Sequence, residues 1–206
     1  MTGAALQTKT HTAEEYLALE VVSAVRNEFR NGEIVETSGG TSEHNEIARM
    51  LSFLLTLDLR RLAYSIFVAD QRLWLPEATL YTYPDVMVTQ KPPKLQTDRN
   101  DTVVSPILIA KVLSKSTQGY DRGDKLEAYR TSETFQEYVL IDQYCPHVGH
   151  YLKQAEDQWL LTKYGKLDTS FRLASVGVDI ALADLYEAIA FENQVSNDDI
   201  VWRDIV

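Results

Sequence analysis

The stretch PILIAKVLSKST, residues 106–117, contains the most strand-like segment of the chain. Its branched aliphatic residues predict a buried strand over residues 107–113. Alternation along a strand places Lys111 on one face with three aliphatic residues, Ile107, Ile109 and Leu113. A lysine in the middle of an apolar strand is costly to bury without a partner. Lys111 therefore indicates the edge of a functional site, or a functional site that has changed.

The overall composition is that of an ordinary globular domain. The chain has 206 residues, of which 45% are hydrophobic and 24% charged. This suits a single domain over residues 1–206, with a core over about residues 12–190. The one cysteine, Cys145, excludes an internal disulfide framework and a cysteine zinc cluster. No apolar run is long enough for a membrane span and no signal peptide is evident, so we expect no membrane partner and a cytoplasmic location.

The charge balance bears on possible partners. The formal net charge is −10, which argues against a protein that binds nucleic acid non-specifically, because phosphate groups would be repelled. It does not exclude a nuclease, because a bound metal ion neutralises part of an acidic cluster.

Local signals predict the first elements of the chain. Thr12 and Glu15 match a capping box at the start of a short helix. Asn31-Gly32, between two β-like segments, predicts a two-residue hairpin. Apolar residues at helical spacing predict a longer helix over residues 42–59.

The remainder of the chain is predicted to be mainly strand. Strand-like segments, two of them forming a hairpin, cover residues 64–75, 83–90, 107–113, 137–142, 147–154 and 158–165. Helices are predicted over residues 121–130 and 182–191, and a surface loop over residues 91–105. This order predicts the α/β (α+β) class: a mixed central β-sheet flanked by α-helices, with additional antiparallel strands in residues 143–180.

Two charged residues suggest a chemistry. Asp85 begins a strand after Pro84, and Lys111 lies in the middle of a later strand. The loop between them can return the chain so that the two strands pair. A carboxylate at a strand end beside a charged group in mid-strand is the layout of a metal-dependent phosphodiesterase. Without a wider pattern, the residues favour Asp85 as an ordinary aspartate at the start of a strand.

Several motifs supply that wider pattern. They are EYLAL, EFRNGEIVETSGGTSEHN, YPDVMV, PILIAKVLSKSTQGYDRGDKLEAYR and EYVLID. Together they resemble a large bacterial family of restriction-endonuclease-like proteins within the PD-(D/E)XK nuclease superfamily, over about residues 12–190. The resemblance implies a restriction-endonuclease-like core with helices on both faces of a mixed sheet. It also implies Mg²⁺-dependent cleavage of DNA, and a homodimer is expected by analogy with the fold.

The resemblance also assigns site residues. The YPD aspartate, expected to bind the divalent metal, matches Asp85. The family has a glutamate in the form V-E-V-L-S, and Lys111 stands at that position. The superfamily lysine usually follows two residues later, where this chain has Leu113; in this family it lies in the next helix and matches Lys125. An acidic residue near the hairpin matches Glu28.

Lys111 changes what such a site can do. At about 4 Å from Mg²⁺, an ammonium would be repelled by roughly 8 kcal/mol at an effective dielectric constant of about 20. Either Lys111 turns away, or it pairs with Asp85 and occupies the place of the metal. We expect the second arrangement, because a half-buried lysine needs a partner. Catalysis and Mg²⁺ binding should then be weakened or lost.

Ordinary structural roles remain open for the other candidates. Lys125 could be a solvated lysine paired with Asp121 one helical turn away, and Glu28 could be a surface residue of the hairpin. His44, near the start of the long helix, suits a structural hydrogen bond better than acid–base chemistry. At the level of function, the alternatives to an impaired nuclease are a non-catalytic binding module that contacts nucleic acid or protein and a structural homo-oligomer whose edge strands pair.

Overall fold

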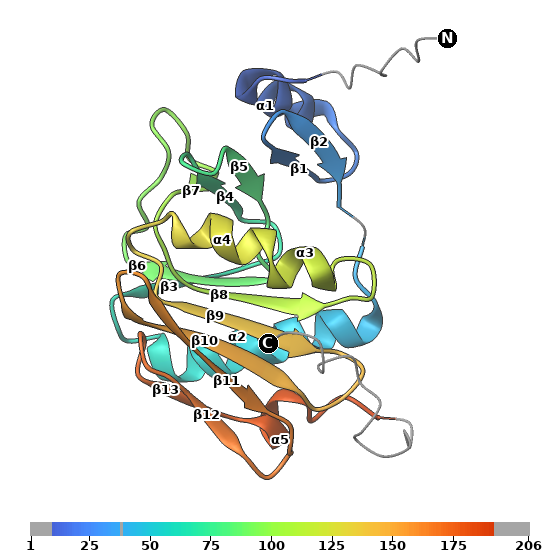
Figure 1. Ribbon diagram of the computed structural model, residues 1–206, viewed down its shortest axis with the longest axis vertical. Coiled ribbons are helices and arrows are strands. Elements are labelled where there is room, and N and C mark those ends of the chain that lie inside the picture. Colours follow the sequence, from blue (N-terminus) through green and yellow to red (C-terminus); the bar gives the residue numbers. More distant parts are fainter. Residues whose placement is uncertain (1–9, 38, 192–206) are drawn as a thin grey trace.

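The computed structural model describes residues 10–37 and 39–191, which form β-sheets flanked by helices (Figure 1). The predicted α+β class, with mixed sheet and flanking helices, is confirmed. The helices of the described residues are α1 (Ala13–Val22), α2 (Ser42–Leu59), α3 (Gln118–Arg122), α4 (Asp124–Arg130) and α5 (Leu182–Leu185). None of them is both long and apolar enough to cross a membrane.

The larger sheet has six strands and carries Lys111 near its centre. Its strand order is β11 (Gln158–Tyr164), β10 (Val148–Ala155), β9 (Glu137–Asp142), β8 (Pro106–Leu113), β6 (Val86–Gln90) and β3 (Tyr64–Val68). Strands β8 and β9 are parallel, and the other neighbours are antiparallel. Strand β8 is buried along its whole length, as its aliphatic sequence predicts.

A second sheet lies above the first (Figure 1). Its strand order is β2 (Glu33–Glu36), β1 (Asn27–Arg30), β5 (Leu80–Thr82), β4 (Arg72–Leu75) and β7 (Thr102–Val103). A further pair, β12 (Ser170–Leu173) and β13 (Val178–Ala181), forms a separate hairpin. The sequence predicted one central sheet. A bend at Asp70-Gln71 is expected within residues 64–75, but no local pattern indicates that it sends β3 and β4 into different sheets.

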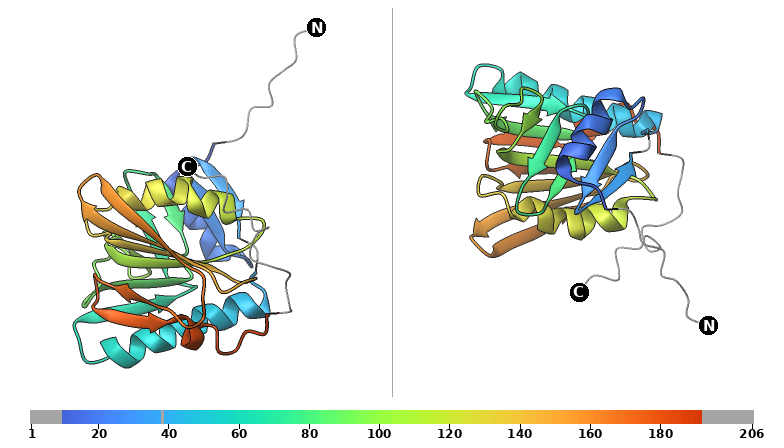
Figure 2. Two further views of the ribbon diagram at one scale, coloured as in Figure 1. Left: turned by 60° about the horizontal axis from the view of Figure 1, so that its bottom comes forward. Right: turned by 90° about the horizontal axis from the view of Figure 1, so that it is seen from above.

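Three clusters of buried apolar residues hold these elements together. One face of the six-stranded sheet packs against α2, α5 and the β12–β13 hairpin; α2 and the hairpin lie together on one side of the sheet in Figure 2. The other face packs against α4 and against Leu73, Leu75 and Leu80 of the second sheet. A smaller cluster of Tyr16, Phe29 and Tyr81 fixes α1 on the second sheet. Helix α4 therefore lies beside the second sheet, on the same face of the six-stranded sheet (Figure 2).

The register of β8 corrects one detail of the predicted alternation. Val88 pairs with Leu108 but Thr89 pairs with Pro106, so Ile107 is an extra residue. Such a β-bulge interrupts the alternation of faces. Ile107 consequently joins the apolar cluster on the α2 side. Lys111 keeps its predicted position, on the face of Ile109 and Leu113.

The structure confirms the elements predicted from strong local signals and corrects several that were predicted from weaker ones. The capping box of Thr12 and Glu15 is present, and the Asn31-Gly32 turn has positive φ at both residues, as such hairpins require. The predicted loop over residues 91–105 contains the short strand β7. The predicted helix over residues 121–130 is broken at Gly123, whose backbone is not helical. Of the late helix predicted over residues 182–191, only the turn α5 forms.

Candidate functional site

The four site residues suggested by the sequence line one cavity. It has a volume of about 330 Å³ and lies where the second sheet, α3, α4 and the first turn of α2 meet β8. Asp85 and Lys111 come from the six-stranded sheet and the segment that leads into it, Glu28 from β1 and Lys125 from α4. The fold thus brings together residues that are far apart in the sequence.

Asp85 and Lys111 form a buried ion pair. The Lys111 ammonium lies 2.9 Å from Oδ1 of Asp85, and both residues are 9% exposed. The ammonium also lies 3.4 Å from the carbonyl oxygen of Tyr83. The contact expected from the sequence is therefore present, and Lys111 does not turn away to solvent.

The second oxygen of Asp85 is occupied as well. The backbone N–H of Val112 donates to Oδ2 at 2.7 Å, and Nε2 of His44 lies 3.4 Å from the same oxygen. Burial alone would raise the pKa of Asp85, but the charge of Lys111 and the contact with His44 hold that pKa well below its usual range. Burial would likewise lower the pKa of Lys111, and Asp85 raises it instead. The pair is therefore charged at neutral pH.

His44 is held close to the chain segment that precedes α2. Thr41 is the N-cap of α2, and its side chain accepts a hydrogen bond from the backbone N–H of His44. The imidazole of His44 then lies beside Gly40, so that a Cβ added to Gly40 would be only 2.6 Å from Nδ1. Only glycine allows this approach without displacement of the ring. The imidazole contacts Asp85, and the structural role expected for His44 stays a prediction.

Glu28 and Lys125 form a second buried pair. The Lys125 ammonium lies 2.7 Å from Oε1 of Glu28, and Arg30 contacts Oε2 at 2.5 Å. Thr82 also donates to Oε1 of Glu28. Glu28 is 2% and Lys125 4% exposed. The alternatives of a surface glutamate and a solvated lysine are therefore wrong, because the second sheet and α4 close over both side chains.

Asp121 is a cavity residue to which the sequence assigned only a pairing role. It is fully buried, and Oδ1 lies 3.4 Å from Lys125. Neither carboxylate oxygen has a hydrogen-bond partner among the described residues. The spacing of Asp121 and Lys125 by four positions predicted their contact, but nothing local indicated that both would be buried. Arg30 was also missed, although alternation places it on the same face of β1 as Glu28.

The environment of Glu28 predicts a dependence of stability on pH. Burial alone would raise its pKa, but Lys125, Thr82 and Arg30 lower it from 4.5 to about 2. Because the folded-state pKa is the lower one, this contribution to stability is complete above about pH 4.5 and is lost as the pH falls towards 2. We expect an acid-induced loss of about 3 kcal/mol from this group, measured by urea unfolding at several pH values.

Glu28→Gln should remove that part of the pH dependence. Glu33→Gln is the matched control, because Glu33 is exposed on the same hairpin. If the two variants lost unfolding free energy equally between about pH 5 and pH 2, the assignment of the shift to Glu28 would be wrong.

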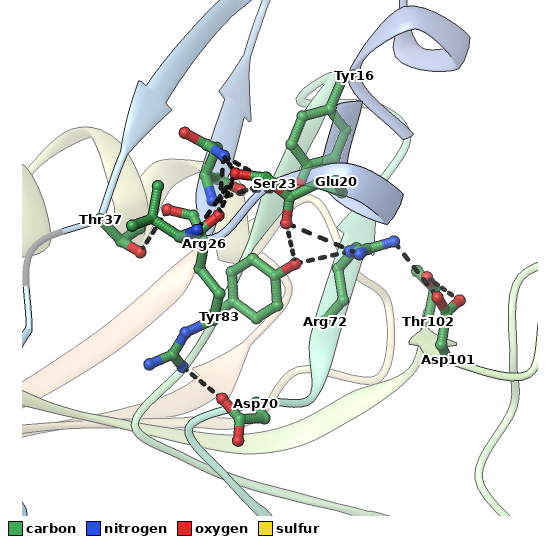
Figure 3. A network of polar contacts seen from close by, with 12 residues as sticks. Tyr16, Glu20, Ser23, Arg26, Thr37, Asp70, Arg72, Tyr83, Asp101 and Thr102 are labelled. Atoms are coloured by element: carbon green, nitrogen blue, oxygen red, sulfur yellow. Dashed lines mark hydrogen bonds and ion pairs between the residues drawn. The ribbon is translucent and has the colours of Figure 1, made fainter. Parts of the chain in front are cut away.

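A neighbouring network positions the segment that carries Asp85 (Figure 3). The Tyr83 hydroxyl donates to Glu20 of α1 at 2.7 Å and accepts from Nε of Arg72 of β4 at 2.9 Å. Arg72 also lies 3.5 Å from Asp101. Both the ring and the carbonyl of Tyr83 are therefore fixed, and the carbonyl is one of the two oxygen contacts of Lys111.

The charges at the centre of the cavity balance. Glu28, Asp85 and Asp121 are opposed by three cations, Arg30, Lys111 and Lys125. Magnesium prefers several oxygen ligands in a near-octahedral arrangement. Within the described ranges, no group of three or more His, Cys, Asp or Glu residues could hold a metal ion. With both oxygens of Asp85 engaged, the residues present do not fit the Mg²⁺ site that the resemblance implies.

The mixed sheet with its flanking helices is a restriction-endonuclease-like fold. The model of the Uma2 family, described as "Putative restriction endonuclease", matches residues 13–183. The chain therefore belongs to the Uma2 family.

The chain is also similar to individual proteins. The chain is 46% identical to the uncharacterized protein sll1609 of Synechocystis sp. over 156 residues, which are 76% of this chain and 88% of that protein. It is 32% identical to slr1290 of the same organism over 180 residues, covering 86% and 92%. A crystal structure from Anabaena variabilis, described as a "putative nuclease belonging to DUF820", has a TM-score of 0.69 at 17% identity, over 84% of this chain and 96% of that one. That likeness shows the shared fold.

Proposed function

We propose that this chain is a nuclease-fold protein derived from Mg²⁺-dependent DNA endonucleases, in which phosphodiester cleavage is lost or strongly weakened. The observation that carries the proposal is the 2.9 Å contact between the Lys111 ammonium and Asp85. In this arrangement the cation that neutralises the aspartate is supplied by the chain itself. Displacing it would leave a buried ammonium without its partner, which is strongly unfavourable.

The second cation of the site supports the same proposal. A lysine that stabilises charge on a phosphoryl group must be free to contact that group. Lys125 is instead held at 2.7 Å by Glu28 and at 3.4 Å by Asp121, and only 4% of it is exposed. The two lysines of the cavity are thus both paired with carboxylates of the chain.

Binding of DNA without cleavage is the second candidate function. It is favoured by Arg26 and Arg30, which also line the cavity and whose side chains are 45% and 28% exposed. They are the cationic lining residues that a phosphate group can reach, in a chain whose net charge is −10. Binding through phosphate contacts would weaken steeply as salt is added, because each contact releases condensed counterions.

One experiment tests both functions. Supercoiled plasmid is incubated with the wild-type chain, Asp85→Ala and the exposed-surface control Asp58→Ala, with Mg²⁺ or Mn²⁺, and each reaction is divided between a nicking gel and a native gel. We expect no nicking above that of Asp85→Ala. Robust cleavage that Asp85→Ala abolishes and Asp58→Ala retains would overturn the proposal. Salt-sensitive retardation without nicking would establish the second candidate.

A further inference from the structure

Strand β11 forms one edge of the six-stranded sheet. Among the described residues, it pairs with β10 and with no other strand. The backbone N–H and C=O groups on its outer side are therefore available to another strand. Natural proteins usually protect such an edge with proline, with several charges or with very short strands. Strand β11 has seven residues, no proline and a single charged residue, Lys163.

Apolar side chains are exposed along this edge. Leu160 is 52% and Leu161 37% exposed, and they point to opposite faces of the sheet. Leu161 lies opposite Tyr151 of β10. An added strand would cover apolar surface on both faces while it satisfied the backbone groups.

The opposite edge of the same sheet is less suited to pairing. Among the large apolar residues of β3, only Val68 at its end is exposed, to 41%. Tyr64 at its other end contacts the carbonyl of Ser175 in the β12–β13 turn at 3.5 Å. Strand β11 is consequently the better candidate for an intermolecular contact.

The two ends of β11 carry charges of opposite sign. Glu156 and Asp157 form the turn before the strand, whereas Lys163 and Lys166 lie at and beyond its far end, and all four are exposed. A two-fold axis near Leu161 would bring the acidic end of one copy against the basic end of the other. Glu156 would then lie near Lys166 of the second copy.

We propose that β11 is a dimerisation edge, at which a second copy of this chain adds its own β11 in antiparallel orientation. The two six-stranded sheets become one continuous sheet, and the two Leu161 side chains lie together on one face. Such an interface uses the same surface on both copies, as a two-fold dimer requires. Two acidic and two basic residues balance locally, so the net charge of −10 per chain does not concentrate repulsion at this edge.

The oligomeric state tests the proposal. Sedimentation velocity of the full chain over a range of concentrations should show a species of twice 23.4 kDa. Leu161→Lys should shift it to the monomer, whereas Val68→Lys, the matched change at the opposite edge, should leave it a dimer. A monomer at every concentration, or a dimer disrupted by Val68→Lys and not by Leu161→Lys, would overturn the proposal.

A charge exchange tests the orientation of the strands without altering the apolar edge. Glu156→Lys and Lys166→Glu should each weaken the dimer by about tenfold, because every cross-strand contact occurs twice. The double variant should recover the wild-type dissociation constant. If both single changes weaken the dimer and the double variant is weaker still, the antiparallel pairing about Leu161 is wrong.

Discussion

Replacing Lys111 with glutamate is expected to create a binding site for one magnesium ion. The centre of the cavity now has three acidic and three basic side chains. Lys111→Glu changes this balance to four acidic and two basic groups, a net charge of −2, which one divalent cation neutralises. It also supplies a second carboxylate beside Asp85, and oxygen ligands are those that Mg²⁺ prefers.

Calorimetry measures the gain directly. We expect no heat of binding for the wild-type chain and a stoichiometry of one for Lys111→Glu. Because the ion binds the folded state, the variant should also gain about 2.7 kcal/mol of stability at a Mg²⁺ concentration about 100 times its Kd. Lys111→Gln is the matched control, since it removes the ammonium without adding a carboxylate. Identical titrations of Lys111→Glu and the wild-type chain would refute the placement of Lys111 at the metal's position.

The contact between Lys111 and Asp85 was predictable because it depends on few elements. The two residues lie on or beside neighbouring strands, and the cost of an unpaired lysine in an apolar strand requires a partner nearby. The hairpin at Asn31-Gly32 and the helix over residues 42–59 were predictable for a similar reason, since their signals are local. None of these inferences needed the relative placement of the two sheets.

The burial of Glu28 and Lys125 could not be derived in that way. It arises because the second sheet and α4 pack next to each other on one face of the six-stranded sheet. The chain segment that directs the second sheet there, around Asp70-Gln71, is predicted only as a bend. The same arrangement buries Asp121 and brings Arg30 to the cavity. Gly123 breaks the helix between Asp121 and Lys125, yet their spacing still allows contact at 3.4 Å. Side chains that meet only through the stacking of two sheets leave no periodic signal in the sequence.

Removing the charge of Asp85 should be the most destabilising single change at this site. Asp85→Asn keeps an oxygen that can accept from the Val112 N–H, but it leaves the Lys111 ammonium buried without an opposite charge. Breaking a buried ion pair from one side typically costs about 3–5 kcal/mol. The unfolding free energy, measured with urea at neutral pH, should fall by that amount.

The double variant Asp85→Asn with Lys111→Met separates the charge effect from the loss of shape. With both charges removed and the aliphatic volume of the lysine retained, we expect stability to return to within about 1 kcal/mol of the wild-type value, or above it. Asp179→Asn provides the exposed comparison, because it breaks a 2.5 Å ion pair in which the side chain of Arg172 is 58% and that of Asp179 62% exposed. This change should lower the unfolding free energy by less than about 1 kcal/mol. If Asp85→Asn were as mild as Asp179→Asn, the ammonium of Lys111 would not depend on Asp85, and the cation would not be acting in place of a metal.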